Sequence, residues 1–270
     1  MASTIVSFHA HPDDEAILVG GTLALAADAG HRVVLVFATR GDLGEVAEGV
    51  LAPDEALAQR REQEARAAGA VLGAARVEFL TYHDSGMAGE DTNDAADAFA
   101  GADVEEAAAQ LAALLREEHA DVLTVYDERG GYGHPDHIQV HVVGRRAAAL
   151  AGTPRVYAAT TSKEHFLALG EQLADQVPAD MERPDPEELD LGVPEARITT
   201  TVDVRRALDR KRAAMAAHPS QISDESFFLA LPPDAFSLVF GTEWFIRLDE
   251  TPTAPESWIL DEPAPTAEPS

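Results

Sequence analysis

The residue types best suited to chemistry lie at positions 11–15, His-Pro-Asp-Asp-Glu, directly after a short apolar run. His11 and Asp14 can bind a divalent metal through an imidazole nitrogen and a carboxylate oxygen. Asp13 then stays free to accept or deliver a proton. Pro12 fixes its own φ and favours an extended residue before it, so a turn is expected just after the first ligand. The stretch therefore predicts a metal site with a carboxylate base beside it.

The same stretch is also typical of the first turn of a helix, which favours acidic side chains and proline. For Glu15 alone we prefer this structural interpretation. For the whole stretch we prefer the metal site, because a second His-Pro-Asp occurs at positions 134–136 and is followed by His137. Each cluster comes just after an apolar run, where a strand of an α/β sheet would end.

One histidine of the second cluster would complete the site. Together with His11 and Asp14 it gives three protein ligands, which is typical of a catalytic metal centre that keeps one position for water. His134 precedes a proline and is expected outside the helix, whereas His137 and His141 lie four positions apart on one helix face. Spacing alone allows either His137 or His141 to bind, and for His141 we prefer an ordinary helix position.

Short apolar runs alternate with longer amphipathic segments, which is typical of βαβ units on a parallel sheet. The pattern predicts strands at 4–8, 32–38, 77–82, 121–126, 155–160, 199–204 and 244–248, and helices at 16–29, 53–72, 104–119, 137–150, 163–173 and 205–217. The predicted fold class is α/β: a Rossmann-like, open and mostly parallel sheet with helices on both faces. In such a sheet the first and fourth strands flank the switch point where ligands bind, so both clusters are expected to face one crevice.

The length of 270 residues favours a single domain. We place this domain at residues 1–250, with a core at 1–160 and a smaller C-terminal part at 161–250 that shapes the pocket. Residues 176–196 are rich in Pro, Asp and Glu and predict an excursion from the fold. Residues 251–270 have a similar composition and predict a disordered tail.

Composition limits the function further. The net charge of −28 argues against binding to nucleic acid, which needs a basic surface. The chain has no cysteine, so a metal must be bound by His, Asp and Glu. No apolar run is long enough to span a bilayer, and the N-terminal sequence has no signal-peptide pattern. We therefore expect a cytoplasmic enzyme with a small-molecule substrate and no membrane partner. The oligomeric state is left open.

The two clusters carry a family resemblance. Residues 11–15 and 126–137 resemble the PIG-L/LmbE-like zinc-dependent N-deacetylases, and the loop 39–42, Thr-Arg-Gly-Asp, is similar to a loop of that family. Residues 84–87, Asp-Ser-Gly-Met, are similar to its actinobacterial branch, which handles mycothiol and its precursor. Residues 218–221, His-Pro-Ser-Gln, look more like the mycothiol-conjugate amidase than the precursor deacetylase.

The resemblance implies a role for each matching residue of the metal site. It implies a Zn²⁺ ion, or Fe²⁺ or another divalent metal, bound by His11, Asp14 and His137. Asp13 would be the general base. His134 would be the cationic or hydrogen-bonding group at the oxyanion.

Further roles follow from the same resemblance. Asp136 would set the orientation and charge of His134, and Tyr132 would be a mobile tyrosine that helps to hold the tetrahedral intermediate. Asp84 would bind sugar hydroxyls. Arg61 would reach the group attached to the sugar, although an exposed helix position explains this residue equally well. The implied substrate is an N-acyl amino sugar of the glucosamine type.

Two alternatives remain beside a metal-dependent N-deacetylase or amidase. His9 and His11 form an HxH pattern that is found in amidohydrolase barrels, and in a strand both point to one side. That fold needs eight βα units and further ligands on late strands, so we expect His9 to support the site as a neighbour. A non-catalytic sugar-binding protein with a structural metal is the other alternative. The free carboxylate of Asp13 and the open fourth position argue against it.

Overall fold

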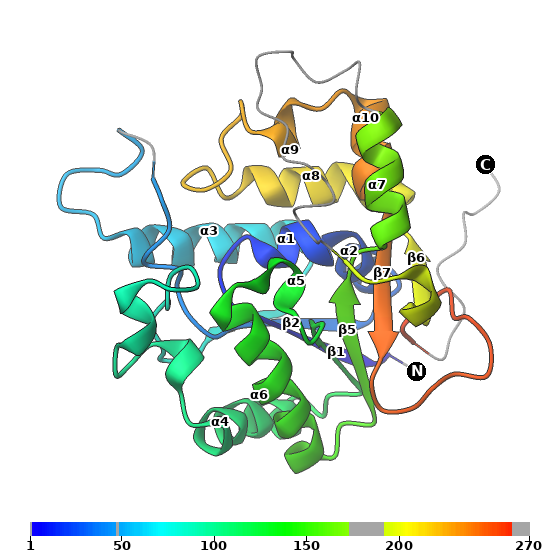
Figure 1. Ribbon diagram of the computed structural model, residues 1–270, viewed down its shortest axis with the longest axis horizontal. Helices are drawn as coiled ribbons and strands as arrows, with labels where there is room; N and C mark the ends of the chain where they lie inside the picture. The colour runs from blue at the N-terminus through cyan, green and yellow to red at the C-terminus, as the bar shows by residue number, and fades with distance from the viewer. Residues whose placement is uncertain (1, 47–48, 173–191, 261–270) are drawn as a thin grey trace.

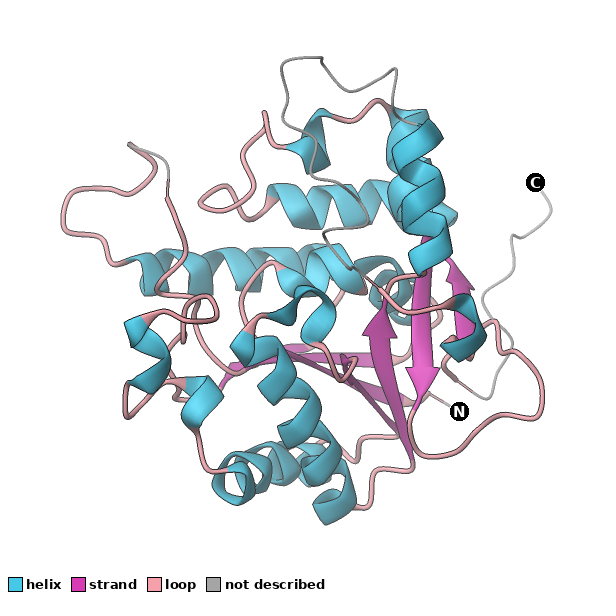
Figure 2. Cartoon of the chain, viewed as in Figure 1, coloured by secondary structure: helices cyan, strands magenta, loops and turns pink. Residues whose placement is uncertain are grey.

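The computed structural model describes residues 2–46, 49–172 and 192–260. In this part of the chain seven strands form one sheet: β1 Thr4–His9, β2 Arg32–Phe37, β3 Arg76–Phe79, β4 Val122–Tyr126, β5 Arg155–Thr160, β6 Thr200–Asp203 and β7 Thr242–Arg247. Their order is β3-β2-β1-β4-β5-β7-β6 (Figures 1 and 2). Strands β1 to β5 pair in parallel, and β7 runs antiparallel to both β5 and β6. The predicted open, mostly parallel sheet is confirmed.

The apolar run of β2 shows why helices cover both faces of the sheet. Val33, Leu35 and Phe37 point into one buried cluster, whereas Val34 and Val36 point into the other. Successive side chains of a strand alternate between the two faces, so an uninterrupted apolar strand needs an apolar cover on each side. Helices on both faces are therefore required by the sequence of the strands.

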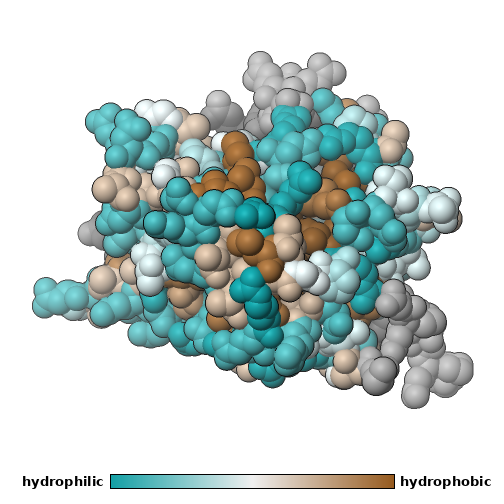
Figure 3. Space-filling model, turned by 90° about the horizontal axis from the view of Figure 1, so that it is seen from below, coloured by the Kyte–Doolittle hydropathy of each residue, from teal (hydrophilic) through white to brown (hydrophobic). Residues whose placement is uncertain are grey.

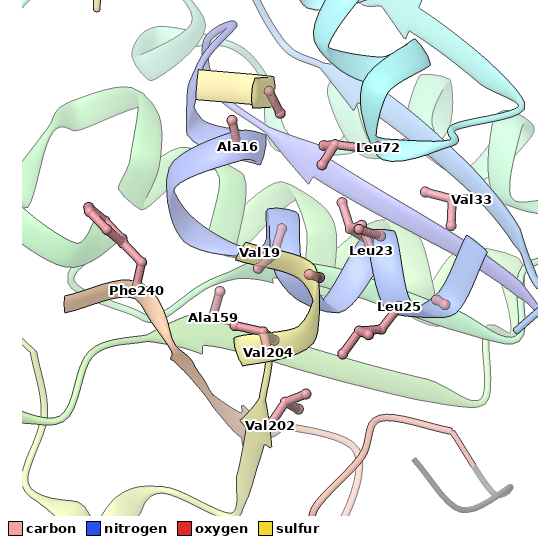
Figure 4. Packing of buried hydrophobic residues seen from close by; sticks show 14 of the residues in the cluster. Ala16, Val19, Leu23, Leu25, Val33, Leu72, Ala159, Val202, Val204 and Phe240 are labelled. Carbon is pink, nitrogen blue, oxygen red and sulfur yellow. The ribbon is translucent and has the colours of Figure 1, made fainter. Parts of the chain in front are cut away.

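The described helices are α1 Asp14–Leu18, α2 Gly20–Asp28, α3 Leu57–Leu72, α4 Val104–Glu117, α5 Gly130–Gly133, α6 Pro135–Ala151, α7 Lys163–Gln172, α8 Leu208–Ala216, α9 Phe227–Ala230 and α10 Pro233–Phe240. Short 3-10 turns are Asp91–Asp94, Phe99–Gly101, Glu195–Arg197 and Arg205–Ala207. Helices α4 and α6 pack together on one face, and α8 packs against α2 and α3 on the other. Figure 4 shows Val19, Leu23, Leu72 and Val204 among the side chains that form the core of the second face.

The predicted helix at 16–29 is interrupted at Val19, between α1 and α2. The cause is a contact distant in sequence: the carboxylate of Glu243 in β7 accepts hydrogen bonds from the backbone N–H groups of Gly21 and Thr22, each at 2.8 Å. A Cβ on Gly21 would lie 2.5 Å from Cβ of Val204, so glycine permits the close approach. A helical sequence pattern cannot reveal such a cap.

Other boundaries also differ from the predictions. Helix α3 begins at Leu57 instead of residue 53, and β3 ends at Phe79 instead of residue 82. Helices α9 and α10 were not predicted, because their short apolar segments carry no clear helical period. Because the sheet has two free edges, β3 and β6, the eight-unit barrel is wrong for the described residues.

The C-terminal segment differs from the predicted disorder. Residues 251–260 are described, and Trp258, Ile259 and Leu260 are buried in the core on the α2–α8 face. The predicted disorder at 261–270 and most of the predicted excursion at 176–196 lie outside the described residues.

The face of the molecule drawn in Figure 3 is mainly hydrophilic. Figure 3 shows one face on which hydrophobic residues form small patches between hydrophilic ones. None of the described helices combines the length and the apolar character that a membrane crossing requires.

Candidate active site

Both sequence clusters lie at the carboxyl ends of neighbouring parallel strands. His11 comes two residues after the end of β1, and α6, which begins after β4, carries His137 in its first turn. Strands β1 and β4 are hydrogen-bonded to each other, as predicted for a switch point. The imidazole ring centroid of His11 lies 4.6 Å from that of His134 and 5.4 Å from that of His137. The fold therefore brings the clusters into one crevice.

The three predicted metal ligands meet around one oxygen. Oδ2 of Asp14 lies 3.6 Å from Nδ1 of His11 and 3.4 Å from Nε2 of His137. All three side chains are buried. Ligand atoms of a tetrahedral zinc site with bonds of about 2.1 Å lie about 3.4 Å apart, so these spacings suit a single ion.

One atom of the cluster lacks a hydrogen-bond partner. Nε2 of His137 is buried and makes no hydrogen bond to any described residue. An unpaired buried imidazole nitrogen is unfavourable unless a ligand occupies it, and a metal ion supplies that partner. Two groupings around His11 place three ligand atoms within 4.8 Å of one another, one with His134 and His137 and one with Asp84 and Asp136; neither includes Asp14. This buried His/Asp cluster can bind a metal.

Asp13 adopts a constrained backbone conformation beside this cluster. Its φ is +101°, which is uncommon for a residue with a side chain. Its carbonyl accepts hydrogen bonds from the N–H groups of Ala16 and Ile17 at 3.0 and 3.1 Å, and its own N–H donates to Oε2 of Glu15 at 2.9 Å. Its Oδ2 accepts a hydrogen bond from Nη2 of Arg61 at 3.2 Å. The backbone of Asp13 is therefore held by hydrogen bonds to α1, and its carboxylate is bound by Arg61.

The neighbouring carboxyls of Asp13 and Asp14 have opposite proton affinities. Burial raises the pKa of Asp13 to about 6, against the opposing charge of Arg61. Burial also acts to raise the pKa of Asp14, but His137 and His11 outweigh it and hold that pKa well below its usual range. Asp14 thus stays ionised, as a metal ligand must, whereas Asp13 has a pKa suited to proton transfer near neutral pH.

Arg61 is engaged within the protein. Its side chain is only 3% exposed, so the interpretation as an exposed helix residue is wrong. The guanidinium donates to the carbonyl of Pro12 at 2.5 Å and to that of Gly41 at 2.7 Å, in addition to Asp13. Gly41 has φ +62°, and a Cβ there would collide with the guanidinium. Arg61 thus joins the loop after β2 to the loop that carries Asp13.

His134 is oriented by a backbone group. Its Nδ1 accepts a hydrogen bond from the N–H of Asp136 at 3.2 Å, which leaves the proton of a neutral ring on Nε2. Burial, together with the neighbouring His11 and His137, lowers the pKa of His134 to about 4. The carboxylate of Asp136 instead accepts from the N–H of Ser85 at 3.0 Å, from the Ser85 hydroxyl, and from Nε2 of His11 at 3.1 Å. Asp136 was expected to orient His134. It does so through its backbone N–H and not through its carboxylate.

Asp84 and Tyr132 lie at different depths. Asp84 is buried, and its Oδ1 is 3.4 Å from Nε2 of His11. Tyr132 is 54% exposed in α5, and its ring centroid lies 5.0 Å from that of His137. Ser85 was not among the predicted site residues, although its position next to Asp84 in Asp-Ser-Gly was a usable signal.

Buried polar side chains support the site from behind. His9 is 1% exposed; its Nδ1 pairs with the hydroxyl of Tyr126 at 3.0 Å, and its Nε2 with the hydroxyl of Ser7 at 2.7 Å. The Tyr126 hydroxyl also accepts from the N–H of Ala10 at 3.1 Å. Burial lowers the pKa of His9 to about 4, so the ring is neutral. His9 is a supporting neighbour, as predicted, and the role of Tyr126 was missed.

A cavity of about 530 Å³ opens beside Asp13, Asp14 and His137. The opposite wall is apolar and comes from α1, α7, α10 and β7. Its side chains include Ile17, Leu18, Phe166, Leu169, Phe240 and Trp244. Segments from both halves of the chain thus line one pocket.

The fold and the site define an α/β protein with a His/Asp metal-binding cluster at the switch point of its sheet. A sequence profile of the PIG-L family, described as GlcNAc-PI de-N-acetylase, matches residues 6–148. The 1D-myo-inositol 2-acetamido-2-deoxy-α-D-glucopyranoside deacetylase 1 of Catenulispora acidiphila is 41% identical, over 92% of this chain and 84% of its own length. A deacetylase of the same name from Acidothermus cellulolyticus is 39% identical, over 93% and 90%. The chain belongs to the PIG-L family.

Solved structures share the fold at low sequence identity. The N,N'-diacetylchitobiose deacetylase of Pyrococcus horikoshii aligns with a TM-score of 0.60 and 21% identity, over 92% of this chain and 84% of that one. The 4-carboxy-2-hydroxymuconate hydratase of Pseudomonas putida aligns with a TM-score of 0.58 and 20% identity, over 91% and 96%. Because the fold carries both a hydrolase and a hydratase, the reaction must be argued from the site.

Proposed function

We propose that this protein is a metal-dependent N-deacetylase that hydrolyses the acetamide of 1D-myo-inositol 2-acetamido-2-deoxy-α-D-glucopyranoside. The observation that carries the proposal is the buried Nε2 of His137, which lacks a hydrogen-bond partner among the described residues and lies 3.4 Å from Oδ2 of Asp14, with Asp13 lining the same cavity. The relatives named for this reaction support the substrate, since their similarity extends over about nine tenths of the chain.

We assign the metal to His11, Asp14 and His137. Two imidazoles and one carboxylate form a donor set that suits Zn²⁺, and the chain has no thiolate to compete with it. A bound Zn²⁺ would supply Lewis acidity for an amide carbonyl and would lower the pKa of water toward ~7.

Asp13 is the proposed general base. An amide is a poor electrophile and its amine a poor leaving group, so hydrolysis needs a proton removed from water and a proton delivered to nitrogen. A carboxyl with a pKa of about 6 can do both in turn. The hydrogen bonds from Arg61 and to Glu15 hold Asp13 in place for these transfers.

His134 is the proposed donor to the oxygen on which negative charge develops. The backbone bond from Asp136 to Nδ1 leaves Nε2–H as the free donor of the ring. Tyr132 follows glycines at positive φ in α5 and is proposed as a second group that approaches this oxygen. Asp84 as a sugar ligand and Arg61 as a contact to the group on the sugar remain predictions. A cytoplasmic location also remains a prediction.

A conjugate amidase is the other activity that the sequence suggested, through residues 218–221. His218 is fully buried against Glu15 and does not line the cavity, so its resemblance to the amidase provides no direct contact with a substrate. We therefore favour the deacetylase.

The test is hydrolysis of the acetamido-glucosyl inositol and of a mycothiol S-conjugate by metal-stripped and zinc-restored protein. We expect zinc-dependent release of acetate from the first substrate. His137→Ala is the matched control, which should remain inactive when zinc is added. Turnover of the S-conjugate alone would show that the protein is an amidase instead of a deacetylase. Full activity after verified metal removal would refute the metal-dependent mechanism.

A further inference from the structure

His218 forms a buried pair with Glu15, in the first turn of α1. Its Nε2 lies 2.6 Å from Oε1 of Glu15, and both side chains are 0% exposed. The two residues are 203 positions apart in the chain. The hydrolysis described above assigns no role to His218.

The second carboxylate oxygen of Glu15 contacts Asp13, the proposed general base. Oε2 accepts the backbone N–H of Asp13 at 2.9 Å, at the residue whose φ is +101°. A residue with a side chain keeps such a conformation only where its surroundings hold it there. Glu15 therefore uses one oxygen to fix the backbone of Asp13 and the other to bind His218.

We propose that Glu15 and His218 form a positioning pair that holds Asp13 in its reactive orientation. The pair acts through Asp13, so the proposal rests on Asp13 as the general base. An acidic residue in the first turn of a helix needs no partner when it is exposed to water. Glu15 is instead buried with both oxygens occupied, which is the arrangement expected of a carboxylate that orients its neighbours.

The segment after α8 also supports the other contact of Asp13. Two residues after His218, Ser220 donates its N–H to Oε1 of Glu64 at 3.1 Å and its hydroxyl to Oε2 of Glu64 at 2.5 Å. Glu64 lies in α3, the helix that supplies Arg61 to the carboxylate of Asp13. The segment at 218–221 thus anchors Glu15 and, through Glu64, the helix that carries Arg61, which gives its residues a role without a contact to substrate.

The test compares His218→Leu with His218→Gln. Glutamine can place an N–H donor near the position of Nε2, whereas leucine fills the space without a donor. We expect His218→Leu to lower kcat about 10- to 100-fold, since small displacements of a catalytic group have effects of this size. KM and bound zinc should be unchanged. His218→Gln should keep kcat within about threefold of the wild type.

If His218 had a purely structural role, its substitution would change the thermal stability but not the kcat of the folded, zinc-loaded protein. The matched control is His31→Leu, because His31 is also buried and accepts a hydrogen bond, from the N–H of Ser3 at 3.0 Å. It precedes β2, at the opposite end of the strands from the site, and its kcat should equal that of the wild type. If His218→Leu does not fold, His218→Asn keeps an amide whose donor falls short of Glu15, and the same loss of kcat is expected.

Equal losses in His218→Leu and His218→Gln, or unchanged kcat in His218→Leu, would refute the positioning pair. Crystal structures of both variants give a second readout that does not depend on substrate. We expect Asp13 to leave its positive φ in His218→Leu and to keep it in His218→Gln, and an unmoved Asp13 in His218→Leu would overturn the proposal. Wild-type protein that releases no acetate, combined with a displaced Asp13 in the variant, would instead refute the proposed function and leave the pair supported.

Discussion

Asp13 and Asp14 are adjacent in the chain, yet their surroundings give them different proton affinities. Asp14 faces two imidazoles, which stabilise its ionised form. For Asp13, burial outweighs the opposing charges of Arg61 and His218 and raises the pKa. The turn at Asp13 produces this separation, because its positive φ directs the two carboxyls to different partners.

The first prediction concerns Asp13. Asp13→Ala should lower kcat about 10²- to 10⁴-fold, the usual contribution of a general acid–base group. Bound zinc should remain stoichiometric, because the proposed ligands are His11, Asp14 and His137, whereas the carboxylate of Asp13 is bound by Arg61. Metal analysis and steady-state kinetics on the same sample check both expectations. Loss of zinc together with recovery of activity in excess zinc would make Asp13 a ligand instead of a base.

Helix α6 carries much of the site on its first turn. It packs against β4 at Gly144, where a Cβ would collide with Val125, so glycine sets how closely the helix approaches the sheet. His137 lies two turns before this contact and His134 caps the same helix. The spacing between helix and sheet thus controls where both imidazoles sit relative to His11.

The second prediction tests this contact. Gly144→Ala should lower the free energy of unfolding by about 1–3 kcal/mol, as overpacking of a core usually does, and should weaken zinc binding. Urea denaturation and a zinc titration measure the two effects. Val142→Ala, at a 40% exposed position of the same helix, is the control and should change stability by less than about 0.5 kcal/mol. Equal effects of the two substitutions would show that close packing at Gly144 is unimportant.

The molecule as a whole depends on contacts between its two halves. Glu243 of β7 caps α2, the segment after α8 binds the loop that carries Asp13, and the chain returns after β7 to bury Trp258. The pocket is lined by both halves. Site geometry and global stability are therefore coupled.

The third prediction follows from metal binding to the native state. Free zinc at about 100 times its Kd should raise the free energy of unfolding by about 2.7 kcal/mol. Thermal melts of metal-stripped protein across a zinc series measure this shift. His137→Ala should show a much smaller shift, because it removes the nitrogen that lacks a partner. A zinc-independent melting temperature in the wild type would contradict the assigned ligands.

The fourth prediction concerns the C-terminal segment. Trp258→Ala should destabilise the protein by about 3–5 kcal/mol, since it removes a large side chain that is 5% exposed in the core. Urea denaturation measures this loss. Ser257→Ala, at the exposed neighbouring position, is the control and should have little effect. Equal stability of the two variants would favour the disorder that the composition predicted.

The sequence by itself determined the order of strands and helices, the two faces of the sheet and the meeting of the two clusters. Apolar periodicity and the topology of parallel sheets are local or general rules, so they needed no coordinates. The residue types of His11, Asp14 and His137 also indicated a metal site, because few other functions combine imidazole and carboxylate in this way.

Tertiary structure alone decided how the site is supported. The break before α2, the engagement of Arg61 with Asp13, and the pair of Glu15 and His218 all depend on groups brought together by folding. Composition suggested disorder beyond residue 250, but the fold provides an apolar surface that buries Trp258. These outcomes depend on which surfaces meet in space, and a pattern read along one segment contains no information about its distant partner.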